Sequence, residues 1–381
     1  MPRLVGTLVG DIQREAPAQT KYGLLFEALE QHWQQPVPTV DATLRGWRRL
    51  VNGLMVFHPN LPLWKERFYQ NVPAFISRSQ QVGHCLAQMH TAGQADVALQ
   101  VGVTFDGTWG NDQLPVILYT DYTTHMAIQT PEAGRSPFTA VQGQRLLQLE
   151  KQAYSRAAHI FTRSELVRES IMADYKVAAD KITSVGGGVN FRELPEPNEP
   201  RNNGRPTALF IGKDFYRKGG DLLLQAFAQT REHIPHSRLI MVTEGPIPAD
   251  LPLDGVDIVP PTWNREVIHN LYREADLFVL PSRLETWGDV LLEAMAYGLP
   301  CVGATRQAMG EIISHGQTGL VVPPGDGYAL YSALLWLMIN PWLRGKWGEA
   351  GRARLETHFT WPRVVEKMAP IIEEVAARGK K

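Results

Sequence analysis

Short apolar runs alternate with longer amphipathic stretches along most of the chain. In the second half, the runs are bounded by Gly, Pro or Asp and predict buried strands. Between them, apolar residues recur at helical spacing, as at Leu222, Leu223, Ala226 and Phe227. This alternation predicts a parallel sheet with helices on both faces. The expected strands are 207–212, 238–243, 276–281, 301–304 and 319–322, and the expected helices are 221–230, 267–275, 290–297 and 328–339.

The first half shows the same alternation less regularly. Its expected strands are 4–9, 97–104, 116–120 and 159–162, and its expected helices are 24–33, 72–89, 142–158 and 165–175. A segment with four prolines and no apolar periodicity separates the halves. We therefore expect an α/β chain with two doubly wound, Rossmann-like domains facing across a cleft. The expected parts are a first domain (1–191), a linker (192–206), a second domain (207–360) and a C-terminal segment (361–381) whose helix crosses back to the first domain.

Composition narrows the functional classes. The chain has 381 residues, with 38 Lys and Arg against 39 Asp and Glu, a balance that argues against a nucleic-acid-coating protein. Two cysteines exclude a disulfide framework and a cysteine-rich zinc site. No apolar run is long enough to span a bilayer, and the N-terminus lacks signal-peptide features. We expect a cytoplasmic protein, with peripheral contact at the inner face of a membrane as an alternative.

Two glutamates mark the end of one predicted strand and the helix that follows it. Glu285 lies in the loop after the strand, and Glu293 lies eight positions later, within the helix. The helix begins near Gly288, and a helix N-terminus attracts phosphate. Glu293 could accept hydrogen bonds from a ribose diol, and Glu285 could bind the hydroxyls of a sugar. The structural alternative is a pair of surface glutamates.

Three cations lie in the loop after the strand 207–212. Lys213, Arg217 and Lys218 share this loop with glycines that permit close backbone approach. A diphosphate leaving group requires cations of this kind. The structural alternative is a set of solvated loop side chains.

Together these residues resemble the retaining glycosyltransferases of the GT-B fold, family 4 (glycosyl transferases group 1). Glu285 and Glu293 are similar to that family's E-x7-E motif, and the segment 212–219 is similar to its glycine-basic loop. The resemblance implies that Glu293 binds the nucleotide ribose and that Glu285, with Thr286, contacts the donor sugar. It also implies a site without metal or cofactor, with a nucleotide-diphosphate sugar as co-substrate. The implied diphosphate ligands are Lys213, Lys218 and Arg217, helped by backbone N–H groups near Thr286, Trp287 and Gly288.

The sequence departs from the family pattern at three places. Lys213 stands where the family usually has Arg, which keeps the charge but loses the bidentate fork. Thr286-Trp287-Gly288 replaces the usual Gly-Phe-Gly, so we expect a narrower sugar pocket. Asn190 replaces the usual Asp.

The acceptor side is less clearly marked. The family often has a His after the N-domain strand that corresponds to 116–120; here Asp121 aligns, and His125 follows four residues later. Either residue could orient an acceptor hydroxyl as a catalytic group, while helix capping is the structural alternative for Asp121. The usual Gly-Gly loop after the first strand is missing. In its place we expect Gly10, Tyr22 and Gly23 to contribute to the acceptor side.

The segment 42–95 holds six basic residues and one acidic residue. Within it, Trp47, Leu50, Val51 and Leu54 form an apolar side of a helix. Two interpretations fit this pattern: the apolar side packs on the core with a solvated basic face, or the helix contacts an anionic membrane.

The functional expectation is a retaining, metal-independent glycosyltransferase. It would move a sugar from a UDP- or GDP-linked donor to a hydroxyl of a saccharide or lipid-linked acceptor. The alternatives are a non-catalytic sugar-nucleotide-binding or scaffold subunit, and a sugar-nucleotide epimerase of the same fold. An oxidoreductase is disfavoured because no G-x-G-x-x-G follows a strand.

Overall fold

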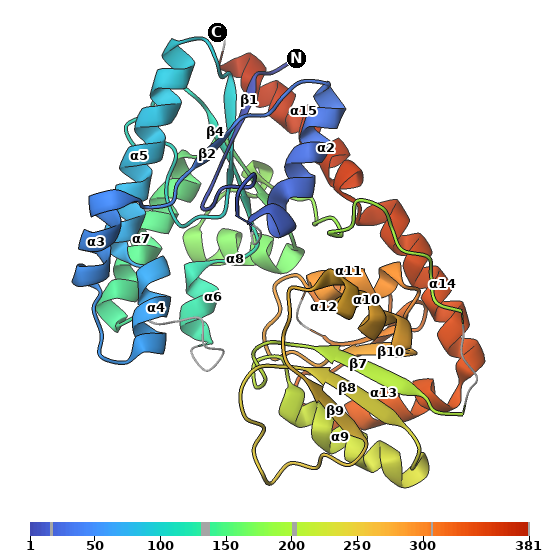
Figure 1. Ribbon diagram of the computed structural model, residues 1–381. Helices are drawn as coiled ribbons and strands as arrows, with labels where there is room; N and C mark the ends of the chain where they lie inside the picture. Colours follow the sequence, from blue (N-terminus) through green and yellow to red (C-terminus); the bar gives the residue numbers. More distant parts are fainter. Residues whose placement is uncertain (16–17, 131–137, 200–203, 306–307, 380–381) are drawn as a thin grey trace. The chain divides into compact units, whose positions relative to one another are not determined.

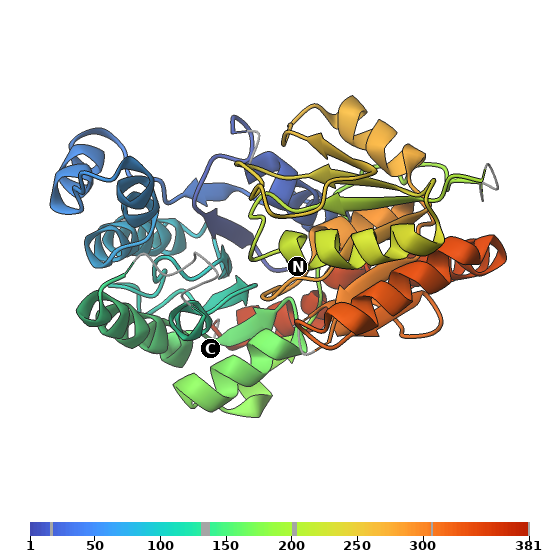
Figure 2. The ribbon, with the colours of Figure 1, turned by 90° about the horizontal axis from the view of Figure 1, so that it is seen from below.

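The computed structural model describes residues 1–15, 18–130, 138–199, 204–305 and 308–379, and it contains two compact units. Unit 1 comprises Met1–Gly188 together with Trp361–Lys381, and unit 2 comprises Val189–Thr360. Among the described residues, each unit contains one six-stranded parallel sheet with helices on both faces (Figures 1 and 2). The expected fold class, two doubly wound α/β domains, is confirmed.

Unit 1 has the strand order β2-β1-β3-β4-β5-β6. Asn71 caps α5 by accepting a hydrogen bond from the backbone N–H of Ala74 at 2.8 Å, and Thr139 and Gln142 form a capping box that begins α7. Its elements are β1 (Leu4–Leu8), η1 (Gln19–Gly23), α2 (Leu24–Trp33), β2 (Thr39–Asp41), α3 (Gly46–Met55), α4 (Leu61–Tyr69), α5 (Val72–Thr91), β3 (Val97–Val101), β4 (Val116–Thr120), α6 (Thr124–Gln129), α7 (Ala140–Arg156), β5 (His159–Thr162), α8 (Glu165–Tyr175), η3 (Ala179–Lys181), β6 (Ile182–Ser184) and α15 (Trp361–Arg378).

Two apolar layers enclose the sheet of unit 1. On one face, α2 and α15 pack together over the strands, with Phe26, Trp33 and Met368 in the core between them. On the other face, α5, α7 and α8 cover the strands, and Tyr154 and Ile171 lie in that core. Helix α15 follows unit 2 in the sequence, yet its buried side chains complete the core of unit 1.

Unit 2 has the strand order β12-β11-β10-β7-β8-β9. Helices α9 and α13 pack together on one face, and α10, α11 and α12 cover the other (Figure 1). The proline-rich segment 192–206, as far as it is described, is counted with unit 2, where the Asn198 side-chain amide donates to the carbonyl of Tyr272 at 2.8 Å. The elements are β7 (Thr207–Ile211), α9 (Gly220–His233), β8 (Arg238–Val242), β9 (Val256–Val259), α10 (Arg265–Glu274), β10 (Leu277–Leu280), α11 (Asp289–Ala296), β11 (Cys301–Ala304), α12 (Met309–Ile312), β12 (Gly319–Val322), α13 (Gly327–Ile339) and α14 (Pro341–His358).

The strand order of unit 2 reverses beside β7. This strand comes first in the sequence but lies inside the sheet, with β8 on one side and β10 on the other. The connections after β7 and β10 therefore lead to opposite faces of the sheet and diverge at the carboxyl ends of these two strands. Ligands of doubly wound folds bind at such a switch point.

The expected strands and helices are present, with ends shifted by no more than three residues. The apolar pattern did not predict the strands β2, β6 and β9 or the long helix α14. It also did not predict the shorter helices η1, α4, α6, η3 and α12. Of the two interpretations of the helix at 47–54, the one in which its apolar side packs on the core is wrong. Trp47, Leu50 and Leu54 are exposed, whereas Asn52 is buried, so α3 presents its apolar side to solvent.

A buried carboxyl group joins three helices of unit 1. Glu150 on α7 accepts hydrogen bonds from the hydroxyl groups of Tyr154 and Tyr175 and from the backbone N–H of Thr124. The Tyr175 oxygen in turn accepts a hydrogen bond from the backbone N–H of His125 at 3.0 Å. Burial raises the pKa of Glu150 to about 7, although these hydrogen bonds partly oppose the increase.

This shift predicts a pH-dependent stability. Between an unfolded pKa near 4.5 and a folded pKa of about 7, the folded chain binds more protons at Glu150 than the unfolded chain. The contribution of Glu150 to the free energy of unfolding is therefore greatest below pH 4.5 and falls until about pH 7. In Glu150→Gln this decline should be absent, a differential change on the order of 3 kcal/mol.

Thermal melting from pH 4.5 to pH 8 tests this expectation. The melting temperature of Glu150→Gln should rise relative to wild type as the pH increases. The exposed Glu232 on α9 provides the control, because Glu232→Gln should follow wild type throughout. A pH-independent difference between Glu150→Gln and wild type would contradict the assignment.

Candidate functional site

An ion pair lies at the point where the strand order of unit 2 reverses. Lys218, after β7, pairs with Glu285, after β10. Their side chains are only 14% and 8% exposed, and Ser282 Oγ lies 3.5 Å from the same carboxylate oxygen of Glu285. The structure thus brings together two of the predicted site residues at the position where this fold binds ligands.

Glu293 is a largely buried carboxylate on α11, with a side chain that is 12% exposed. The hydroxyl of Tyr272 donates to Glu293 Oε2 at 3.0 Å, and Arg265 Nη1 lies 3.7 Å from Glu293 Oε1. Burial raises the pKa of Glu293, although Arg265 and Tyr272 partly oppose the increase. The carboxylate is therefore held in a fixed orientation with acceptor capacity beyond these two contacts.

The other two cations of the predicted phosphate loop have different environments. Lys213 is exposed and forms an ion pair with Glu244, which follows the neighbouring strand β8, at 3.1 Å. Arg217 is largely buried, with Nε 3.0 Å from Asp214 Oδ2 and Nη1 donating to the carbonyl of Leu284 at 3.2 Å. Lys213 can turn toward a ligand, whereas Arg217 joins the loops after β7 and β10.

Two glycines permit the backbone geometry of these loops. Gly219 has φ +76°, and a Cβ atom there would lie 2.2 Å from the carbonyl oxygen of Pro281. Gly288 has φ +109° and caps α11. Between Glu285 and this cap, the side chains of Thr286 and Trp287 are buried, with the Trp287 ring 5.8 Å from that of Phe359. Thr286 and Trp287 can therefore offer a ligand their backbone rather than their side chains.

In unit 1, charged side chains gather at the carboxyl ends of the strands. Asp121, directly after β4, lies 3.2 Å from Lys21 Nζ and 4.0 Å from Arg163 Nη1, measured from its Oδ2 atom. Lys21 Nζ also lies 5.0 Å from the centre of the Tyr22 ring. Burial raises the pKa of the Tyr22 hydroxyl, and the nearby Lys21 charge opposes this increase. The structure thus places the predicted Asp121 and Tyr22 in one cluster.

His125 lies apart from this pairing. Its Nε2 atom is 3.4 Å from Asp174 Oδ1 on α8, and its backbone N–H donates to Tyr175. The capping role that sequence analysis offered as an alternative for Asp121 belongs to Thr123, whose hydroxyl accepts from the backbone N–H of Met126 and begins α6.

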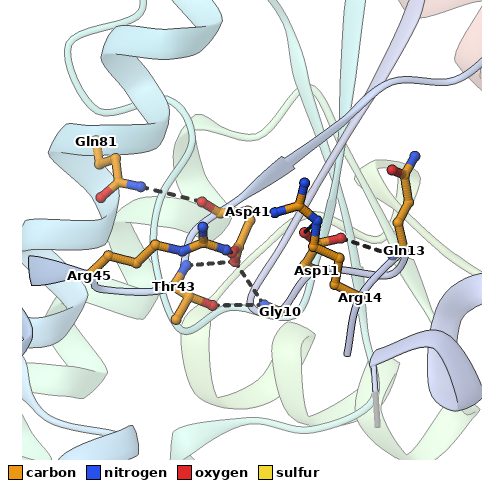
Figure 3. A network of polar contacts seen from close by, with 8 residues as sticks. All are labelled: Gly10, Asp11, Gln13, Arg14, Asp41, Thr43, Arg45 and Gln81. Carbon is orange, nitrogen blue, oxygen red and sulfur yellow. Dashed lines mark hydrogen bonds and ion pairs between the residues drawn. The ribbon is translucent and has the colours of Figure 1, made fainter. Parts of the chain in front are cut away.

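The predicted Gly10 lies in a polar network after β1 (Figure 3). Its backbone N–H lies 3.0 Å from both Asp41 Oδ1 and Thr43 Oγ1, and Arg45 Nη2 lies 2.6 Å from Asp41 Oδ2. Burial raises the pKa of Asp41, but the hydrogen bonds from Thr43, Gly10 and Arg45 hold it below its ordinary value. Gly23 is buried at the junction of η1 and α2. Of the predicted residues Tyr22 and Gly23, only Tyr22 therefore has a side chain that could contact a ligand.

Sequence reasoning missed several partners. No local motif relates Glu293 to its partners Tyr272 and Arg265, because they lie on another helix. The same holds for Lys213 and its partner Glu244, which follow different strands. Lys21 sits in the short helix η1, where no periodicity marks it. Arg163 had a usable signal, because it directly follows the predicted strand 159–162 and so lies at the same sheet edge as Asp121.

In the described part of the chain, no group of three or more His, Cys, Asp or Glu side chains could hold a metal ion. None of the described helices combines the length and the low polarity needed to cross a bilayer.

The second unit is similar in sequence to known glycosyltransferases. Residues 205–340 match the family model "Glycosyl transferases group 1". The glycogen synthase of Mycobacterium tuberculosis is 26% identical over 265 residues, which cover 67% of this chain and 63% of that protein. The phosphatidyl-myo-inositol mannosyltransferase of Mycobacterium leprae is 31% identical over 208 residues, which cover 52% and 54% of the two chains. The chain thus matches less than two thirds of the length of these curated relatives.

Solved structures match nearly the whole chain. The sucrose-phosphate synthase of Thermosynechococcus elongatus has a TM-score of 0.70 at 19% identity and covers 98% of this chain and 99% of its own. The Anabaena protein Alr3699/HepE, solved in complex with UDP-glucose, has a TM-score of 0.64 at 13% identity, with coverage of 97% and 99%. Residues 205–340 therefore resemble the Glycosyl transferases group 1 family, and the chain has the GT-B fold.

Proposed function

We propose that the chain is a retaining, metal-independent glycosyltransferase. It transfers a sugar from a nucleotide-diphosphate donor, UDP- or GDP-linked, to a hydroxyl of a saccharide or lipid-linked acceptor. The observation that carries this proposal is the Lys218–Glu285 pair at the switch point of unit 2, with the largely buried Glu293 on the adjoining helix. The family match over residues 205–340 supports it.

Each donor-side residue has a role that fits its surroundings. Glu293, oriented by Tyr272 and Arg265, accepts hydrogen bonds from the ribose diol. Lys218 and Lys213 bind the diphosphate, whose negative charge also favours the N-terminus of α11. Glu285, when Lys218 turns to a phosphate, accepts hydrogen bonds from the hydroxyls of the donor sugar, which replace the lost ion-pair partner. Arg217 positions Lys218 because its guanidinium ties the two loops together.

The reaction needs charge neutralisation at the leaving group. As the bond between the anomeric carbon and the phosphate oxygen breaks, negative charge grows on the diphosphate and is stabilised by Lys213, Lys218 and the backbone N–H groups at 286–288. The acceptor oxygen forms the new bond on the same face, and its proton passes to the departing phosphate. No metal is needed, because these cations supply the positive charge.

The acceptor side is proposed to lie at the Asp121 cluster. Asp121 can accept a hydrogen bond from an acceptor hydroxyl, and the cations Lys21 and Arg163 lie beside it. His125 faces Asp174 and would act only after turning from it. Gly10 and Tyr22 lie on the segments that follow β1 and form part of the same sheet edge.

Glu293→Gln tests the donor site through nucleotide binding. At 100 times its dissociation constant, a nucleotide stabilises the folded chain by about 2.7 kcal/mol, which raises the melting temperature by a few degrees. We expect UDP or GDP, with EDTA present, to produce this shift in wild type. A hydrogen bond to a charged group contributes about 1.5–3 kcal/mol, so Glu293→Gln should weaken binding by about tenfold or more.

The exposed Glu232 again provides the matched control, and Glu232→Gln should keep the full shift. The absence of a shift with UDP, GDP, ADP and dTDP would refute the donor site. If the rise in melting temperature appeared only with Mg²⁺, metal independence would be refuted, whereas the donor site would not.

The variant Lys218→Met, compared with a double variant, tests the contributions of Lys218 to catalysis and to stability separately. Removing one partner of a buried ion pair costs about 3–5 kcal/mol, so this variant should melt earlier than wild type. In the double variant Lys218→Met/Glu285→Gln, no charge is left unpaired, and we expect most of the stability to return. The rate of transfer should stay reduced by about 100-fold or more in both variants, because the leaving-group cation is absent.

Nucleotide release from UDP- and GDP-sugars, with and without acceptors, gives these rates. A double variant with wild-type turnover would show that the pair is only structural. Binding without turnover in wild type would favour the scaffold alternative, and donor conversion without any acceptor would favour an epimerase. Retention is tested by the anomeric configuration of the product, which should equal that of the donor.

A further inference from the structure

Helix α3 presents its apolar side to solvent. Asn52 is buried, and its side-chain amide donates to the carbonyl of Phe68 on α4 at 3.0 Å. On the opposite side, Trp47, Leu50 and Leu54 are 70%, 70% and 77% exposed. Isolated exposed apolar residues need no explanation, but a contiguous group of large ones marks an interaction surface.

Helix α4 extends this surface. Trp64 Nε1 donates to the carbonyl of Gly53 at 3.0 Å and fixes the two helices to each other. Leu61 is exposed, and a groove of about 740 Å³ between the helices is lined by these side chains and by Phe68. Of the nineteen exposed large hydrophobic residues in the described chain, eight lie between residues 47 and 69. Figures 1 and 2 show α3 and α4 (the α3–α4 hairpin, Gly46–Tyr69) at the rim of unit 1 beside α5.

The same surface carries an excess of positive charge. The segment 42–71 contains five basic residues, and Glu66 is its one acidic residue. The Arg48 guanidinium lies 5.8 Å from the Trp47 ring, and that of Arg49 lies 5.3 Å from the Phe68 ring. Lys65 lines the groove beside Arg49. Cations beside aromatic and aliphatic side chains form the pattern of an interfacial helix, whose apolar side enters the boundary between lipid headgroups and acyl chains.

We propose that the α3–α4 hairpin docks onto an anionic lipid bilayer. Trp47, Leu50 and Leu54 enter the bilayer boundary, and Arg49 and Lys65 contact acidic headgroups. A second copy of this chain fits the surface less well, because a symmetric contact would bring Arg48, Arg49 and Lys65 of both copies together. Docking of the hairpin onto a bilayer does not depend on glycosyl transfer.

Vesicle flotation tests the proposal with the full chain. Wild type should float with phosphatidylcholine vesicles that contain 30% phosphatidylglycerol and should bind weakly to phosphatidylcholine alone. Each cation near an anionic surface contributes about fivefold in partitioning, so Arg49→Ala/Lys65→Ala should reduce binding by about 25-fold. Raising the salt concentration should reduce the binding of wild type in the same direction.

Leu50→Glu/Leu54→Glu tests the apolar contribution. Both positions are exposed, so the fold should persist, as circular dichroism and melting can verify. Replacing two inserted leucines by charged side chains should reduce partitioning by more than about tenfold. The matched control is Trp342→Glu on α14, because Trp342 is 72% exposed and lies away from the hairpin in sequence and in unit.

Four outcomes would overturn the proposal. In the first two, wild type fails to bind anionic vesicles, or it binds neutral vesicles equally well. In the third, Trp342→Glu loses as much binding as the hairpin variants. In the fourth, both hairpin variants keep their binding. Sedimentation velocity provides the comparison with self-association. A concentration-dependent dimer that Leu50→Glu/Leu54→Glu abolishes, without vesicle binding by wild type, would assign the hairpin to a contact between copies.

Discussion

The largely buried pairing of Lys218 with Glu285 is the interaction on which the proposed donor site depends. Two loops that follow neighbouring strands diverge at this point, and a charge on each loop meets the other in a largely water-excluded position. Neither charge is stable there alone. A ligand that attracts Lys218 must therefore also provide hydrogen-bond donors for Glu285. A nucleotide-diphosphate sugar satisfies both conditions in one molecule, with its phosphate for the lysine and its hydroxyls for the carboxylate.

The supporting residues act by fixing these loops. Arg217 binds Asp214 within its own loop and the carbonyl of Leu284 in the other. Gly219 permits the backbone to approach Pro281 closely, which any larger residue would prevent. The charge arrangement is thus a property of the two loops together, and it rests on contacts between residues far apart in sequence.

Sequence reasoning reached the fold more completely than the site. Short apolar runs identified strands such as 116–120 because buried parallel strands need apolar side chains on both faces. Periodicity gave the apolar side of α3 but not its direction, because spacing alone does not say whether that side meets the core or the solvent. The proximity of Lys218 and Glu285 could be predicted because loops at the carboxyl ends of neighbouring strands converge. The orientation of Glu293 by Tyr272 could not, because α10 and α11 meet only in the folded chain.

Because of helix α15, the cores of the two units are completed at different stages of chain synthesis. Unit 2 is one continuous stretch, Val189–Thr360, and its core draws only on residues within that stretch. The core of unit 1 includes Trp361, Val364, Met368 and Ile372, which are made after unit 2 is complete. During translation, unit 2 can therefore acquire its full core first, while the earlier-made part of unit 1, Met1–Gly188, still has one face of its sheet partly uncovered. Of the two units, the one that begins earlier in the sequence is thus the one that completes its core later.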